Sequence, residues 1–168
     1  MSKLVLALGL CIAAVVVETI LAGNRPANFL RSLRQPKWAL PPAVWYLVGG
    51  SYYALCFLSL YRLSSWGPPQ RSPAFWLIVI LMASNAGWNW LFFRQRNLRL
   101  AYLFFFPYSL LAIAVVAALL QVDRLSGMVF DIYLIYLPYA LAWSFQVWRL
   151  NGSVPKLGGS QDGMDKSN

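Results

Sequence analysis

Five apolar stretches of about 20 residues dominate the sequence, and as helices each could cross the ~30 Å hydrocarbon core of a bilayer. They are Leu4–Ala22, Pro42–Tyr61, Ala74–Phe93, Leu100–Leu120 and Met128–Trp148. Of the 14 basic and five acidic side chains, only Glu18 and Asp131 fall within these limits. The sequence therefore predicts an all-α integral membrane bundle of five transmembrane helices over residues 1–151, with a flexible polar C-terminal tail at 152–168.

The composition excludes several classes of protein. Apolar residues make up 60% of the chain and charged residues 11%, against about 25% charged residues in soluble domains. The chain has no histidine, so catalytic Ser-His-Asp and Cys-His sets and histidine-ligated metals are excluded. Both cysteines, Cys11 and Cys56, lie in apolar stretches and are interpreted as small buried side chains. We expect no metal and no cofactor, and we assign no catalytic residue.

Basic residues are distributed unequally between the two sides of the predicted bundle. Ten belong to the connections 23–41 and 94–99 and to the C-terminal end, whereas four lie on the other side. The positive-inside rule then places the N-terminus outside, and the 23–41 loop and the C-terminus in the cytoplasm. The net charge of +9 follows from this topology, so we expect no nucleic-acid partner.

The two acids within the spans have different interpretations. Glu18 is costly to bury and is a functional candidate for that reason, although it lies close enough to the end of its span to reach the headgroups. Two features argue against a cleaved signal peptide: Glu18 near the end of the span, and Ile20-Leu21-Ala22, which is a poor cleavage site. Asp131 is expected in the first turn of the last helix, where the helix dipole favours an acid.

The connection 23–41 is unusually long for so small a bundle. It carries three prolines, a fourth (Pro42) begins the next span, and Phe29, Leu30 and Leu33 lie among its arginines. One interpretation is a lid that folds over the mouth of the bundle. The alternative is an interfacial segment that lies among the headgroups.

Three motifs in order resemble those of one family. Leu33-Arg34-Gln35-Pro36-Lys37-Trp38 with Pro41 is similar to L-x-K-P-x-W-x-P-P, and Asn85-Ala86-Gly87-Trp88 with Phe92-Phe93 is similar to N-x-x-W-x-x-x-F-F. Trp148-Arg149-Leu150-Asn151 matches a terminal W-R-L-N. Over residues 5–151 the chain thus resembles the TspO/MBR family of tryptophan-rich sensory proteins. Five spans and a long first loop are what that resemblance implies.

The chain departs from the family pattern at several positions. Aligned without gaps from Trp38, Gly49 replaces a tryptophan of the second span, and Asn89 replaces a proline of the third. Aligned backward from Trp148, Tyr136 replaces the pocket tryptophan of the fifth span. A register that uses Pro138-Tyr139 is possible but would require a shorter helix.

The resemblance and the helical spacing together predict a ligand pocket. Asn85, Trp88 and Asn89 are spaced to share one helix face, and a second helix carries an aromatic stripe. The predicted ligand-binding residues are Trp38, Gly49, Tyr53, Asn85, Trp88, Asn89, Tyr133, Tyr136, Tyr139 and Trp143, and the predicted lid residues are Phe29, Leu30, Leu33, Pro41 and Pro42. The alternative is that these tyrosines and asparagines only tie helices together by hydrogen bonds.

The resemblance implies a membrane receptor that binds tetrapyrroles (porphyrin, haem precursors) or sterol-like apolar ligands and senses or transports them, with porphyrin a ligand rather than a cofactor. One alternative is a light-dependent porphyrin-degrading enzyme, which the replacements at Gly49 and Tyr136 disfavour. Another is a structural or partner-binding membrane protein without a ligand. The resemblance also implies a homodimer through the third span, where Ala83-x-x-x-Gly87 could instead serve packing within one bundle.

Overall fold

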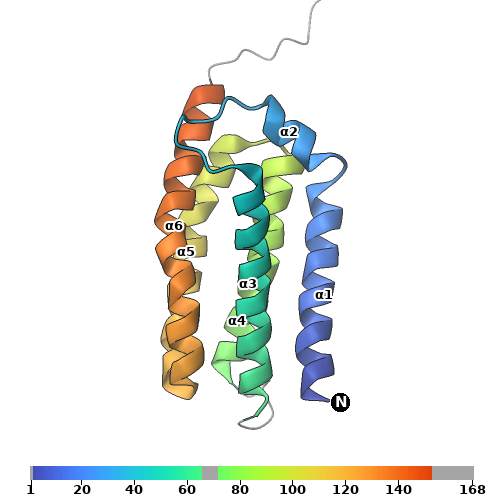
Figure 1. Ribbon diagram of the computed structural model, residues 1–168, viewed down its shortest axis with the longest axis vertical. Coiled ribbons are helices and arrows are strands. Elements are labelled where there is room, and N and C mark those ends of the chain that lie inside the picture. Colours follow the sequence, from blue (N-terminus) through green and yellow to red (C-terminus); the bar gives the residue numbers. More distant parts are fainter. Residues whose placement is uncertain (1, 66–71, 153–168) are drawn as a thin grey trace, which may run out of the picture.

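Five long helices form the protein, as the sequence predicts (Figure 1). The computed structural model describes residues 2–65 and 72–152, and the rest of the predicted tail lies outside the described residues. The long helices are α1 (Lys3–Ala22), α3 (Pro42–Leu63), α4 (Pro73–Asn89), α5 (Leu98–Val122) and α6 (Arg124–Asn151). All five spans, with α4 continued by a short π-helix, are long and apolar enough to cross a membrane.

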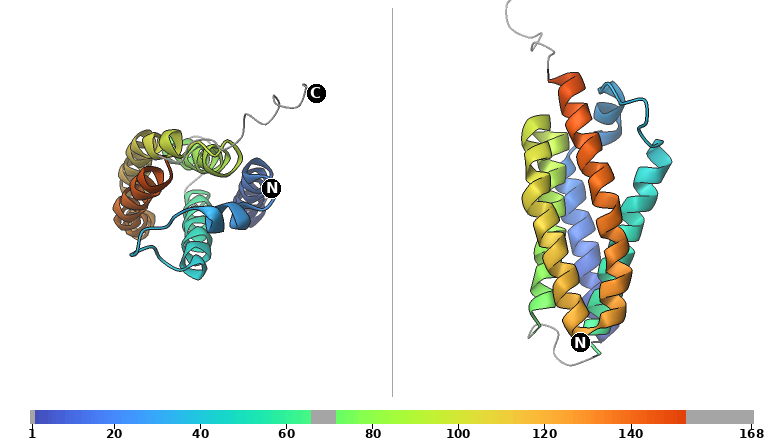
Figure 2. Two further views of the ribbon diagram at one scale, coloured as in Figure 1. Left: turned by 90° about the horizontal axis from the view of Figure 1, so that it is seen from above. Right: turned by 90° about the vertical axis from the view of Figure 1, so that its left-hand side faces the viewer.

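The five helices stand side by side in a closed ring (Figure 2). Around the ring, α1 packs against α3, α3 against α6, α6 against α5, α5 against α4, and α4 against α1. This order places α3 and α6 next to each other although about 60 residues separate them in sequence. The second and fifth spans can therefore contribute to one site.

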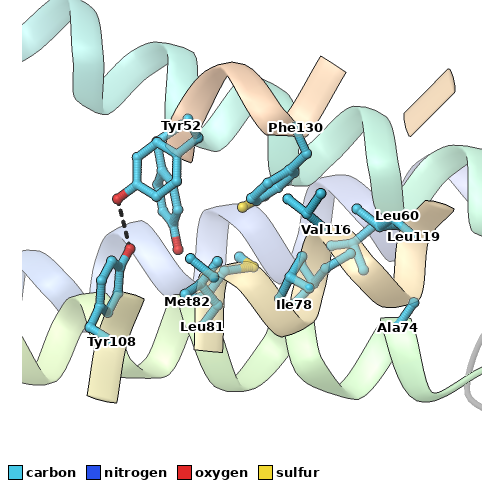
Figure 3. Packing of buried hydrophobic residues seen from close by; sticks show 14 of the residues in the cluster. Tyr52, Leu60, Ala74, Ile78, Leu81, Met82, Tyr108, Val116, Leu119 and Phe130 are labelled. Atoms are coloured by element: carbon cyan, nitrogen blue, oxygen red, sulfur yellow. Dashed lines mark hydrogen bonds between the residues drawn. The ribbon is translucent and has the colours of Figure 1, made fainter. Parts of the chain in front are cut away.

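The half of the bundle near the N-terminus of α1 has a tightly packed apolar interior (Figure 3). Leu60, Ile78, Leu119 and Phe130, from four different helices, are at most 1% exposed and point toward one another. Large apolar side chains on the outer faces remain open, with Ile135 76% exposed. That outer surface is suited to lipid, since an aqueous surface would not carry so many exposed aliphatic side chains.

Two short helices that the sequence did not predict lie at the opposite end of the bundle. α2 (Pro26–Ser32) forms within the long first loop and lies across that end near the end of α1, where it packs against η2, while the segment that follows α2 reaches the last turn of α6 (Figure 1). η2 (Trp90–Arg94) is a π-helix that continues α4. Such local widening of a helix often occurs at functional sites, because it changes the direction of the side chains that follow.

The expected position of Asp131 was wrong. Because α6 begins at Arg124, Asp131 lies two turns inside the helix, where it is exposed. The acid next to the helix start is Asp123, whose carboxylate accepts hydrogen bonds of 2.5 and 2.9 Å from Arg62. This ion pair ties the end of α3 to the turn between α5 and α6.

Candidate ligand-binding site

An aromatic wall lines the seam between α3 and α6. We use this name for Trp45 of α3 and for Tyr136, Tyr139 and Trp143 of α6. The ring centroid of Trp45 lies 4.5 Å from that of Trp143, 6.0 Å from Tyr139 and 6.3 Å from Tyr136. Trp143 is only 2% exposed, whereas Tyr136 and Tyr139 are partly open. The predicted stripe on α6 therefore faces a neighbouring helix, with an indole opposite it that the sequence analysis did not assign to the pocket.

The first loop closes the end of this wall through direct contacts. The indole N–H of Trp143 donates to Oε1 of Gln35 (3.0 Å), and the backbone N–H of Leu40 donates to the hydroxyl of Tyr139 (2.9 Å). Trp38, itself 46% exposed, packs edge-on against the Tyr139 ring at 5.5 Å. The loop is thus fastened to two residues of the wall.

The predicted lid residues occupy two environments. Phe29, Leu30 and Leu33 are half-buried against a small apolar cluster that includes Phe92. The ring of Phe29 lies 5.7 Å edge-on from that of Phe92, which η2 directs toward α2. Pro41–Pro42, in contrast, are exposed at the start of α3. Of the predicted lid residues, only Phe29, Leu30 and Leu33 pack the loop against the end of the bundle.

Open space remains beside Gly49. A Cβ atom built there would meet no atom within 4 Å. Gly49 is one turn from Trp45 on α3 and one turn from Tyr52, and these two residues contact Tyr136 and Tyr133 of α6, respectively. By this register Gly49 lies at the level of Tyr136. Gly49 is exposed, so the space beside it is open to the outside of the bundle at the edge of the aromatic wall.

Tyr133 lies deeper and has a different role. Its hydroxyl shares a 2.8 Å hydrogen bond with that of Tyr108 on α5, and it is only 9% exposed. The ring of Tyr52 lies 5.1 Å away, and the Tyr52 hydroxyl is buried without a hydrogen-bond partner among the described residues. These three tyrosines form the floor below the wall, and the Tyr108–Tyr133 bond ties α5 to α6.

Asn85 and Asn89 of α4 turn toward α1. Their side-chain amides donate to the carboxylate of Glu18 at 2.8 and 3.0 Å. The hydroxyl of Tyr53 donates to the same carboxylate. Glu18 thus points into the bundle and joins α1 to α3 and α4, so the headgroup interpretation does not describe its orientation. Its charge within a span was the signal that could have placed it at the site.

Trp88 faces another way, although its spacing suggested a face shared with the two asparagines. Its indole N–H donates to the backbone carbonyl of Ala101 on α5 (3.2 Å), and its ring stacks on Phe92 at 5.0 Å. Phe92 in turn lies 5.5 Å from Trp143. Trp88 therefore supports the aromatic wall from behind, while Asn85 and Asn89 belong to the Glu18 network.

Two depressions in the surface lie away from the aromatic wall. One, of about 430 Å³, is lined by residues around the α5–α6 turn, including Arg124 and Asp131. The other, of about 420 Å³, lies between the end of α1 and η2 and includes Arg94 and Arg96. Within the seam, the rings of the aromatic wall pack directly on one another.

Comparison with known proteins decides the family. The model of the TspO/MBR family matches residues 7–149. The chain belongs to the TspO/MBR family. It is 31% identical over 130 residues to Protein CrtK of Rhodobacter capsulatus, which covers 75% of this chain and 80% of that protein. It is 27% identical over 132 residues to a tryptophan-rich sensory protein of Cereibacter sphaeroides, covering 79% and 82% of the two chains.

Membership of the TspO/MBR family confirms the resemblance drawn from the three motifs. With five candidate spans, this TspO/MBR protein is a multi-pass membrane protein. Of the predicted site residues, Trp38, Tyr136, Tyr139 and Trp143 come together at the seam, with Gly49 beside them. The others lie in the floor, in the Glu18 network or behind the wall.

Proposed function

We propose that this TspO/MBR protein is a membrane receptor that binds tetrapyrroles or related planar apolar ligands in the seam between α3 and α6. The observation that carries the proposal is an aromatic wall that the first loop contacts at one end, with open space beside it at the exposed Gly49. Aromatic faces are suited to a flat macrocycle, and each stacking contact contributes ~0.5–1.5 kcal/mol beyond burial of area. Sensing or transport would follow from movement of the first loop.

The orientation in the membrane and the assembly are parts of the same proposal. The first loop, η2 and the C-terminal end of α6 lie at one end of the bundle (Figure 1). Their arginines favour the cytoplasmic side for that end. For the dimer, Ala83 is exposed on α4, but a Cβ on Gly87 would face Phe104 of the same chain at 4.0 Å. Of the two small residues, Ala83 therefore remains available for contact with a second copy of the chain.

The experiment is a titration of the purified full-length protein in detergent with protoporphyrin, followed by tryptophan quenching in the dark and under illumination. We expect saturable quenching at micromolar ligand and no loss of pigment. Tyr136→Ala should weaken binding by about tenfold, since it removes a ring from the wall. Tyr46→Ala is the matched control, because Tyr46 is 74% exposed on the outer face of α3.

Two results would contradict the proposal. If neither protoporphyrin nor its neutral ester quenched saturably, the protein would not be a tetrapyrrole receptor. If Tyr136→Ala and Tyr46→Ala had equal effects, the ligand would bind away from the seam. Loss of pigment under light would instead support the enzymatic alternative.

A further inference from the structure

The depression between the end of α1 and η2 has a lining of two kinds. Arg94, Arg96 and Asn24 supply polar groups, whereas Ile20 and Phe93 supply apolar surface. The three polar residues are exposed, and the volume is about 420 Å³. A hollow that combines cationic and apolar groups is suited to an amphiphile with an anionic head.

The two arginines of this depression have no acidic partner. Within residues 2–65 and 72–152, no carboxylate lies within ion-pair distance of Arg94 or Arg96, and the recorded ion pair joins Arg62 to Asp123 at the other end of the bundle. Glu18, the acid of α1, is turned to the interior, where it accepts hydrogen bonds from side chains of α3 and α4. The planar donor set of an unpaired guanidinium matches the oxygens of a phosphate group.

The segment after η2 holds Arg96 in a defined position. Arg94 is the last residue of η2, and Arg96 follows in the left-handed backbone conformation, with φ of 52°. Its guanidinium carbon lies 5.2 Å from the centroid of the Phe29 ring of α2, a cation–π contact. A left-handed conformation is uncommon for residues other than glycine and persists where other contacts hold it. A guanidinium held in this way loses less freedom when an anion binds than a mobile one would.

The depression lies at the depth where lipid phosphates are found. α1 has 20 residues and ends at Ala22, so its length of ~30 Å matches the hydrocarbon core and its end lies at the headgroup level. Ile20 lines the depression and also belongs to the outer face of α1, where Val16 lies one turn below it and both side chains are exposed. The arginines and the lipid-facing surface of α1 are therefore continuous.

We propose that this depression binds an anionic phospholipid, with Arg94 and Arg96 on the phosphate oxygens and an acyl chain along the outer face of α1. The depression at the α5–α6 turn provides a contrast. Its volume is similar, about 430 Å³, but Arg124 shares it with Asp131, whose carboxylate would repel a phosphate. The lipid site lies away from the aromatic wall, so the inference does not depend on tetrapyrrole binding.

The experiment measures lipid binding to the full-length protein in uncharged detergent by native mass spectrometry. The probes are dioleoylphosphatidylglycerol, which is anionic, and dioleoylphosphatidylcholine, which has the same acyl chains but no net charge. We expect the anionic lipid to bind at least about fivefold more tightly. Arg94→Gln combined with Arg96→Gln should bring the ratio of the two affinities close to one. Glycerol 3-phosphate, which has the phosphate without acyl chains, should not displace the anionic lipid at an equal concentration.

The matched control combines Arg31→Gln with Arg99→Gln, which removes the same charge from exposed positions outside the depression. This control should keep the preference for the anionic lipid. Thermal unfolding of each variant reports on folding, and if the first double variant fails to fold, Arg94→Gln alone decides, because it leaves the contact of Arg96 with Phe29 in place.

Three results would overturn the lipid site. Equal affinities of the two lipids would show that charge is not recognised. An equal loss of preference in the two double variants would assign the preference to the net charge of the chain. Displacement of the lipid by an equal concentration of glycerol 3-phosphate would make the depression a site for soluble phosphates. All three results leave the proposed tetrapyrrole function standing, because that function has its own titration.

Discussion

Gly49 and Gly127 lie in helices on the two sides of the same seam, but their surroundings are opposite. A Cβ on Gly127 would lie 2.6 Å from Cδ2 of Leu120 and 2.9 Å from its backbone nitrogen. A Cβ on Gly49 would meet nothing within 4 Å. Gly127 permits close approach of α5 and α6 in the tightly packed half of the bundle. Gly49 leaves open space in the half that carries the aromatic wall.

The difference separates two tasks within one small bundle. The half around Leu60 and Phe130 (Figure 3) supplies cohesion, because its side chains are fully buried and come from four helices. The other half carries partly open rings, a fastened loop and a π-helix. Regions that must admit a ligand are expected at the less tightly packed end of a structure, where local opening costs little.

The largest expected effect is on stability, from alanine at the two glycines. Gly127→Ala should destabilise the protein by about 1–3 kcal/mol, since the nearest atoms include backbone that cannot move cheaply. Gly49→Ala should stabilise it by about 0.5–1 kcal/mol, because alanine is the better helix former and has room. Thermal unfolding in detergent measures both. Equal destabilisation by the two changes would show that the space at Gly49 is filled.

The next effect concerns ligand affinity. Gly49→Leu should weaken binding of the macrocycle by about tenfold, because the new side chain fills the space beside the wall. Gly50→Leu is the matched control, since a Cβ there also meets nothing within 4 Å but its neighbours Tyr46 and Leu47 are 74% and 68% exposed on the outer face. Titration of both variants with the macrocycle tests this prediction. A larger loss of affinity in Gly50→Leu than in Gly49→Leu would contradict it.

A smaller effect is expected when one fastening of the first loop is removed. Tyr139→Phe deletes the acceptor of the Leu40 N–H, and a net hydrogen bond of about 1 kcal/mol predicts roughly fivefold faster dissociation of the ligand. Stopped-flow fluorescence measures the rate. Tyr102→Phe serves as control, because Tyr102 stacks on Trp148 away from the wall. Identical dissociation rates in both variants would mean that the loop does not retain the ligand.

The smallest effect belongs to the tightly packed half and depends on pH. Hydrogen bonding to Arg62 lowers the pKa of Asp123 from 3.8 to about 2. A depressed carboxyl pKa gives stability that is fully present above pH 4 and is lost as the pH falls toward 2. Asp123→Asn should lower the unfolding temperature by about 1–2 °C at pH 7, since the partly exposed pair is screened by solvent, and should flatten the dependence of that temperature on pH between pH 4 and 2. If the unfolding temperature of Asp123→Asn fell as steeply between pH 4 and 2 as that of the parent protein, the acid-dependent loss of stability would come from other groups.

The relation between sequence and structure differs from residue to residue. The motifs around Trp38, Asn85 and Trp148 were sufficient to predict the family, which the comparison confirmed. The spacing of Asn85, Trp88 and Asn89 suggested a shared face, yet α4 directs Trp88 to α5 and the two asparagines to Glu18. Helical periodicity states which positions are close on one helix, but small differences in angle decide which neighbour each side chain reaches.

The sequence by itself determined the five spans, because whether about 20 residues enter a bilayer depends on the local sum of their transfer free energies. Only the tertiary structure decided that Glu18 points inward, that Trp45 completes the wall and that α2 lies across the end of the bundle. Those features depend on contacts between residues far apart in the chain, such as Gln35 with Trp143 and Glu18 with Asn89. Such contacts exist only after the helices have closed into a ring, so no local pattern specifies them.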